Sequence, residues 1–173
     1  MPRHPFSAKR LAGLAVLACA TALMPSPSLA AASPVSAPRC TTAGLVVWMN
    51  TQGDGYAGGV GYTLYLTNQS GHACALSGFP GISAVNLSGR QLGRPASWSG
   101  HHRTVTLATG ATADVQLQLV DVYNYAPGQH CNPVTAAGLR VYPPSQTASK
   151  VIPFPFEACS TSGPVFLSTG PLT

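Results

Sequence analysis

Strict alternation of apolar and polar side chains is the feature that most restricts the fold of this chain. Residues 60–67 (VGYTLYLT) place an apolar side chain at every even position, and residues 113–119 (ADVQLQL) place one at every odd position. A period of two puts one face of an extended strand in a core and the other in water. No stretch of eleven or more residues carries a helical period. The sequence therefore predicts an all-β chain.

Six further short strands are expected, and turn signals separate them. Clusters of Gly, Pro, Asn and Ser, such as residues 68–71 and 143–144, interrupt the apolar segments. A single sheet could not cover its apolar face, so two sheets must stack. We therefore predict an antiparallel, immunoglobulin-like β-sandwich of about seven or eight strands. The further strands are expected at residues 45–49, 82–87, 104–108, 138–142, 151–156 and 165–168.

Two prolines restrict the position of the 151–156 strand. Pro153 and Pro155 have no amide hydrogen to donate to a neighbouring strand, so this segment belongs at an edge or a bulge. Proline also protects an exposed edge against pairing with another chain. We expect residues 151–156 at an edge of the sandwich.

The N-terminus has the three-part pattern of a secretory signal. Three basic residues and no acidic one lie within residues 1–10, and a mostly apolar run occupies residues 11–24. The run is too short to cross a bilayer, which takes about 20 apolar residues. Small residues and prolines follow it, so cleavage is expected after Ala30, with Ala32 as the alternative. We predict a signal peptide over residues 1–30.

Cys19, within the apolar run, leaves a second form of export open. The residues 16–19 (VLAC) loosely resemble a bacterial lipoprotein cleavage box. Lipidation of Cys19 is the alternative to its removal with the signal. Residues 31–39 (AASPVSAPR) are expected to form a short flexible linker between the signal peptide and the folded domain, which is expected over residues 40–170.

Four cysteines remain after the signal, and none has a close neighbour. They are separated from one another by 27 residues or more, whereas structural zinc sites usually place ligands in close pairs such as Cys-x-x-Cys. An even number of isolated cysteines in an exported chain is typical of disulfides. The four are Cys40, Cys74, Cys131 and Cys159.

The expected hairpins predict how these cysteines pair. If the strands at 45–49 and 60–67 are antiparallel neighbours, the residue before the first lies beside the residues after the second. This places Cys40 near Cys74, and the same argument for the strands at 138–142 and 151–156 places Cys131 near Cys159. His72 is then an exposed turn residue beside a disulfide.

The composition of the chain restricts the classes of partner that are expected. Without residues 1–30 the chain has six Lys or Arg and four Asp or Glu, a net charge of about +2 with no clustered basic stripe. Nucleic acid is therefore not an expected partner. No later segment is long and apolar enough to span a membrane. We expect a monomer that is secreted, extracellular or attached to the cell envelope.

A set of cysteines, turn residues and apolar residues follows a fixed order along residues 40–159. The set is Cys40, Leu64, Leu66, Asn68, Ser70, Gly71, Cys74, Leu76, Gly78, Pro80, Gly81, Gly89, Val105, Leu107, Gly110, Ala113, Cys131, Leu139, Val141, Pro143, Pro144 and Cys159. This order resembles an uncharacterised domain-of-unknown-function family of secreted proteins and lipoproteins from high-GC Gram-positive bacteria. The resemblance implies export and a β-sandwich, and it supplies no activity, substrate or catalytic residue.

Groups that could do catalysis are scarce. The acidic residues are Asp54, Asp114, Asp121 and Glu157. Asp121 and Glu157 could in principle form a glycosidase pair, but nothing in the sequence brings them together. A Gly-x-Ser-x-Gly elbow, a phosphate loop and a His-Glu-x-x-His motif are all absent. We predict no catalytic residue, no cofactor and no enzymatic activity.

Histidines and aromatic residues in loops are the candidates for binding. His101 and His102 could share a metal ion in a loop, although neighbours on a strand point to opposite faces. Trp98, Tyr123 and Tyr125 lie in polar loops, and exposed Trp and Tyr suit sugar or protein ligands. The leading hypothesis is a non-enzymatic interaction module for a protein or a cell-wall polysaccharide; an extracytoplasmic metal-binding protein is the alternative.

Overall fold

The computed structural model describes residues 36–173, which form an all-β domain with three short 3₁₀ helices. The predicted signal peptide and Cys19 lie outside the described residues. The strands are β1 (Leu45–Met49), β2 (Asp54–Tyr56), β3 (Gly59–Asn68), β4 (Cys74–Ser77), β5 (Gly81–Val85), β6 (Gln91–Leu92), β7 (Ser97–Trp98), β8 (Thr104–Leu107), β9 (Thr112–Val120), β10 (Pro133–Tyr142), β11 (Lys150–Cys159) and β12 (Leu167–Leu172). The helices are η1 (Thr42–Gly44), η2 (Val122–Asn124) and η3 (Pro127–Gln129).

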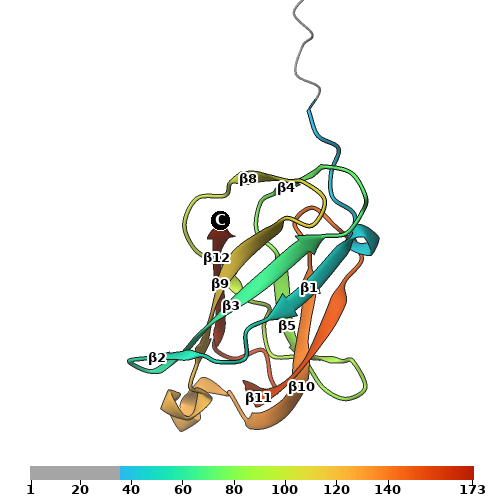
Figure 1. The fold of residues 1–173 in the computed structure, drawn as a ribbon. Helices are drawn as coiled ribbons and strands as arrows, with labels where there is room; N and C mark the ends of the chain where they lie inside the picture. Colours follow the sequence, from blue (N-terminus) through green and yellow to red (C-terminus); the bar gives the residue numbers. More distant parts are fainter. Residues whose placement is uncertain (1–35) are drawn as a thin grey trace, which may run out of the picture. The chain divides into compact units, whose positions relative to one another are not determined.

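Two sheets form the layers of the domain (Figure 1). One has the strand order β1-β3-β9-β12-β7, with β2 paired to β3; the other has the order β11-β10-β5-β6. A separate β4–β8 pair lies at the end opposite to β2, η2 and η3. The pairings are antiparallel except between β7 and β12. The predicted all-β class with antiparallel sheets is confirmed.

The alternating side chains that predicted the strands form the core. Leu64 of β3 is opposite Met49 of β1 and Val115 of β9 in the register, and all three are buried. In the second sheet Leu139 of β10 is opposite Ala84 of β5, and both are fully buried. The inward residues of the two sheets belong to one hydrophobic cluster, which is what joins the layers.

The β11 strand lies at a sheet edge, as its prolines predict. It pairs only with β10 in its sheet, and Pro153 and Pro155 are exposed while Phe154 and Phe156 are partly buried against the core. A β-bulge interrupts the β10–β11 register between Ala136 and Gly138. The strand is longer than expected from the sequence, because it continues beyond the prolines to Cys159.

Four short strands were not expected from the sequence, and one expected strand is displaced. β2, β4, β6 and β7 have only two to four residues each, too few for a period to show. The segment expected at 165–168 forms β12 at Leu167–Leu172 instead, because this strand passes through Gly170 and Pro171 with a register shift after Thr169. A Gly-Pro step normally suggests the end of a strand.

Both predicted disulfides are present. Cys40 is bonded to Cys74 and Cys131 to Cys159, with sequence separations of 34 and 28. Of the predicted linker, Pro38 and Arg39 lie beside β4, where the Pro38 carbonyl accepts from the Ala75 amide. Within residues 36–173, no helix is long and apolar enough to cross a membrane.

The corner beside Cys74 is organised by Asn68. Its side chain is fully buried, and its Nδ2 donates to the carbonyls of His72 at 2.8 Å and Leu107 at 3.0 Å. Its Oδ1 accepts from the amide and the hydroxyl of Ser70, at 2.9 and 2.7 Å. His72 itself is exposed, as expected. The Asn68 side chain therefore stabilises this turn through its four hydrogen bonds.

Candidate functional site

The three aromatic residues singled out in the sequence do not share one site. Trp98 lines a hollow of about 400 Å³ together with Phe79 and His102. Tyr123 and Tyr125 line another, of about 260 Å³, next to Cys131. The two hollows have no lining residue in common. The structure therefore separates Trp98 from the two tyrosines.

Trp98 is exposed but anchored. Its indole is 62% exposed, stacks on Phe79 with ring centroids 5.6 Å apart, and donates from Nε1 to the Pro80 carbonyl at 3.2 Å. The indole thus retains an open surface while the Gly78–Gly81 turn holds its orientation. The positive φ of 108° at Gly78 allows this turn.

Tyr125 contributes mainly to the packing of its loop. Its hydroxyl donates to the Val165 carbonyl at 3.0 Å, and the ring packs against the core cluster. Burial, with a smaller contribution from Tyr56, raises the pKa of Tyr125 above its ordinary value. Through its hydrogen bond to Val165 the phenol attaches the η2 loop to the segment before β12.

A third hollow, not anticipated from the sequence, lies where β2, β3, η2 and β11 meet. It has a volume of about 500 Å³ and is open to solvent; we call it the β2–η2 hollow. The side chains that give it its chemistry are Tyr56, Tyr62, Phe156, Asp121, Asn124 and Glu157, and the rest of the lining is Gly, Val and Leu.

The η2 turn is fixed to the β2–β3 hairpin by hydrogen bonds to one carbonyl. The Asp121 amide and the Asn124 Nδ2 both donate to the carbonyl of Gly58, at 2.9 and 3.2 Å. Asp121 also caps η2, because its Oδ1 accepts from the Tyr123 amide at 3.0 Å. Val122 is buried below the turn. These contacts position Asp121 at the rim of the hollow.

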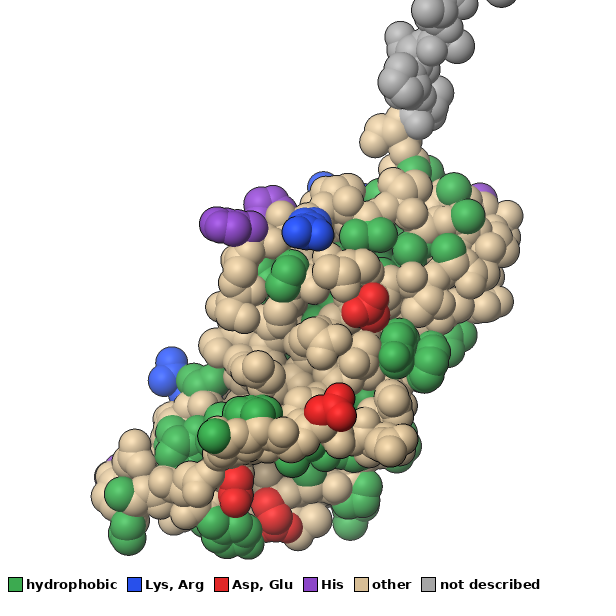
Figure 2. Space-filling model, turned by 60° about the vertical axis from the view of Figure 1, so that its left-hand side comes forward, with side chains coloured by type: hydrophobic (Ala, Val, Ile, Leu, Met, Phe, Trp, Pro, Cys, Tyr) green, Lys and Arg blue, Asp and Glu red, His purple; other side chains and the backbone are tan. Residues whose placement is uncertain are grey.

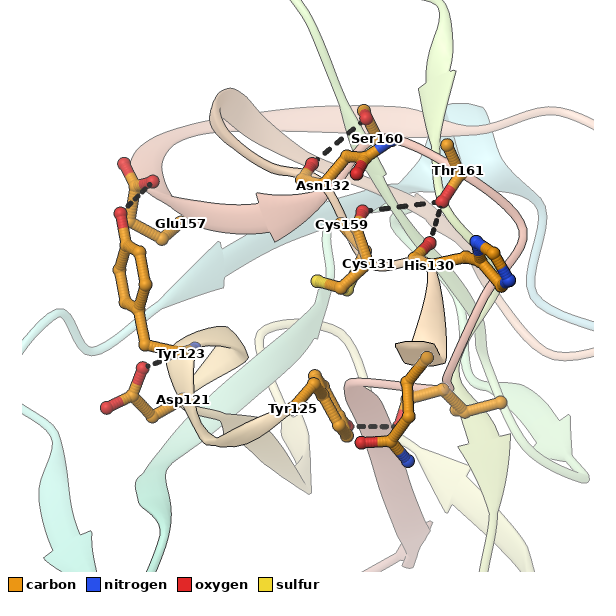
Figure 3. Close-up of a disulfide and its surroundings, with 12 residues drawn as sticks. Asp121, Tyr123, Tyr125, His130, Cys131, Asn132, Glu157, Cys159, Ser160 and Thr161 are labelled. Atoms are coloured by element: carbon orange, nitrogen blue, oxygen red, sulfur yellow. Dashed lines mark hydrogen bonds between the residues drawn. A yellow bond between two sulfur atoms is a disulfide. The ribbon is translucent and has the colours of Figure 1, made fainter. Parts of the chain in front are cut away.

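Glu157 approaches the same hollow from β11. The Tyr123 hydroxyl donates to its Oε2 at 3.2 Å, and the Thr135 hydroxyl donates to its Oε1 at 2.8 Å. Figure 3 shows Tyr123 extending between Asp121 and Glu157, with its hydroxyl directed at Glu157. The hydrogen bond to Glu157, together with the negative charges of Glu157 and Asp121, raises the pKa of Tyr123 above 10.0.

Two of the four acidic residues of the chain therefore line one hollow. The sequence offered no reason to bring Asp121 and Glu157 together, but the structure does so. Figure 2 shows two acidic side chains next to each other, beside apolar side chains, at one end of the domain. The alternation in β11 could have indicated that Glu157 faces outward; the position of η2 over this edge has no local signal in the sequence.

The histidine pair is exposed and does not belong to a cluster of metal ligands. His101 and His102 lie in the loop between β7 and β8. Among residues 36–173, no group of three or more His, Cys, Asp or Glu side chains is placed to hold a metal ion. The metal-binding alternative stays a prediction.

Fold and hollows together define a small, disulfide-linked all-β domain with an acidic and aromatic recess at one end. Residues 40–172 match the family model described as Domain of unknown function (DUF4232). The chain belongs to this family, which confirms the expectation of an uncharacterised domain family. Its secretion and its bacterial source stay predictions. No curated protein and no solved structure matches the chain.

Proposed function

We propose that this domain is a non-enzymatic binding module, secreted or attached to the cell envelope, that holds its ligand in the β2–η2 hollow. The ligand is part of a protein or of an envelope polysaccharide. The two disulfides are compatible with an extracellular location, and the secretory pattern of residues 1–30 supports export.

The observation that carries the proposal is the lining of the hollow. Ligand sites are concave, mostly apolar, and contain a few polar groups in fixed positions, with volumes of about 300–1,000 Å³. The β2–η2 hollow, at about 500 Å³, combines three aromatic rings with two carboxylates. Asp121 is fixed by its capping hydrogen bond, and Glu157 is fixed by two hydroxyls.

The hydrogen bonds of the carboxylates favour binding over catalysis. A glycosidase needs one carboxyl group that carries a proton to the leaving group. Glu157 instead uses both of its oxygens to accept hydrogen bonds, from Tyr123 and Thr135. Asp121 is used as a helix cap. Both groups therefore serve as fixed acceptors.

Retention on isolated envelope material tests the proposal. We expect the purified domain to be retained, and Tyr56→Ala, which removes an aromatic ring from the lining of the hollow, to weaken retention about three- to tenfold, as for the loss of one aromatic contact. Trp98→Ala is the matched control, because Trp98 lines a separate hollow. Loss of retention in Trp98→Ala alone would move the site to the Trp98 hollow; no retention of the unaltered domain would refute the proposed function.

A further inference from the structure

The negative charge of the β2–η2 hollow is not balanced by the residues that line it. Asp121 and Glu157 are both part of the lining, which includes no Lys, Arg or His. The side chains that donate to Glu157 are the neutral hydroxyls of Tyr123 and Thr135. A cation placed here would be attracted by two carboxylates at once.

The hydrogen-bonding groups of the hollow also favour a ligand that donates. The Tyr56 hydroxyl already donates to the Leu119 carbonyl at 3.2 Å, and the Asn124 amide already donates to Gly58. Ionised carboxylates accept only. A sugar hydroxyl both donates and accepts, whereas an ammonium group has three donors and no acceptor. The hollow therefore fits an ammonium group better than a set of hydroxyls.

The aromatic walls suit the aliphatic stem of such a group. Tyr62 packs edge-on against Phe154 with ring centroids 5.0 Å apart, and Phe154 contacts Phe156 at 5.7 Å. Tyr62 and Phe156 form part of the lining. A cation near an aromatic face is attracted by the ring, and the methylene groups of a lysine can lie along an apolar surface.

We infer that the β2–η2 hollow binds a lysine side chain of a partner protein. This inference rests on the proposed function, since it names the group that the binding module recognises. Lysine fits better than arginine because the planar guanidinium binds carboxylates through two parallel hydrogen bonds. At Glu157 both oxygens already accept from hydroxyls, and at Asp121 one oxygen accepts from the Tyr123 amide. A compact ammonium needs only one contact per carboxylate.

Titration of the isotope-labelled domain with short capped peptides tests this assignment. The probe is a capped pentapeptide of four glycines with a central lysine; the matched peptide carries Nε-acetyl-lysine, which has no charge. We expect the lysine peptide to shift amide signals of residues 58–59, 119–124 and 157, and the acetylated peptide to bind at least fivefold more weakly. Equal binding of the two peptides would overturn the inference.

Three variants test which carboxylates contribute to lysine binding. Glu157→Gln and Asp121→Asn keep an acceptor oxygen in place, and Asn also caps helices; each should weaken lysine binding about two- to fivefold, as for an exposed ion pair. Asp114→Asn removes the same charge from the outer face of β9, where Asp114 accepts from Thr173, and should leave binding unchanged. Equal weakening in all three variants would indicate a non-specific charge effect and refute the site.

Two further probes separate failure of this inference from failure of the proposed function. An arginine peptide that binds more tightly than the lysine peptide would overturn the choice of lysine. A glucosamine oligomer that shifts the same amides when the lysine peptide does not would assign the hollow to an amino sugar; the lysine inference then fails while the binding module stands. Retention on envelope material without any response to these peptides would likewise refute the lysine inference and leave the proposed binding module standing.

Discussion

The two disulfides lie in regions that use their polar side chains in opposite ways. Beside Cys40–Cys74, Asn68 is fully buried and uses both ends of its amide within the chain. Near Cys131–Cys159, in the η2 region, Tyr123 is 67% exposed and Glu157 is exposed. The first region is held by its polar groups, whereas the second presents them to solvent.

This difference distinguishes polar groups that the fold requires from polar groups that are available to a ligand. A buried polar group must find partners within the protein, and those partners then depend on it. A carboxylate at the rim of an open hollow is hydrated without a ligand, so its position is not required for folding. The Asn68 corner should therefore respond to substitution through stability, and the β2–η2 hollow should respond through binding.

The largest effects are expected from removal of either disulfide. The closed loops are similar, with separations of 34 and 28 residues, so the chain-entropy model predicts that each bond contributes about 3.5 to 4 kcal/mol. We expect Cys40→Ala/Cys74→Ala and Cys131→Ala/Cys159→Ala to lower the free energy of unfolding by similar amounts in urea denaturation. A loss below about 1 kcal/mol for either pair would contradict the model.

Substitution of Asn68 should have the next largest effect. In Asn68→Ala the carbonyl of Leu107 and the amide of Ser70 lose their partner, and unpaired buried groups cost about 1–3 kcal/mol each. We expect a total loss of about 3 kcal/mol in the free energy of unfolding, measured by urea denaturation.

Asn86 provides the matched control for Asn68. Its Oδ1 accepts from the amides of Ser88 and Arg90 in a similar turn, but the contacts lie at an exposed site. We expect Asn86→Ala to cost about 1 kcal/mol. Equal losses for Asn68→Ala and Asn86→Ala would show that burial does not distinguish the corner.

The disulfide pattern and much of the fold follow from local signals. Alternation at 60–67 and 113–119 predicts β3 and β9 almost to their ends, because one face is buried along β9 and along the second half of β3. The hairpin argument then predicts both disulfides, since Cys40 and Cys74 flank β1 and β3. Pro153 and Pro155 predict the edge position of β11. Each of these inferences depends on a signal within one strand or on the pairing of two strands that follow each other in the expected order.

The candidate site could not be predicted in the same way, because long-range register creates it. Asp121 and Glu157 are brought to one hollow by the β9–η2 connection and by the β10–β11 pairing, in which Thr135 lies opposite Glu157. Trp98 and Tyr123 both look like exposed aromatic residues in polar loops, yet they line different hollows. Nothing local in the sequence encodes the packing of one loop against another strand.

A much smaller effect on stability is expected in the β2–η2 hollow. Glu157→Gln keeps an acceptor for Tyr123 or Thr135 at an exposed position, and substitutions of this kind usually change stability by less than about 0.5 kcal/mol. Urea denaturation should therefore give nearly the same free energy of unfolding as for the unaltered domain. A loss approaching that of Asn68→Ala would place Glu157 among the structural groups and remove the contrast between the two regions.

The smallest expected effect is a shift in the titration of Tyr123. Its phenol donates to Glu157, so ionisation would break this bond and place two negative charges side by side; both raise its pKa above 10.0. Because the folded pKa exceeds the unfolded one, this contribution to stability is complete below pH 10 and is lost as the pH rises through the folded pKa.

NMR titration of the tyrosine ring carbons should show the pKa of Tyr123 falling toward 10.0 in Glu157→Gln. Tyr125 is the internal control, because burial is the main cause of its raised pKa, and the same substitution should leave it unchanged. If Tyr123 titrates at its ordinary value in the unaltered domain, the hydrogen bond to Glu157 is not maintained in solution. The Glu157 side chain would then lack the hydrogen bond that fixes its position, unlike Asn68. The proposed lysine site would lose the fixed acceptor on which it depends.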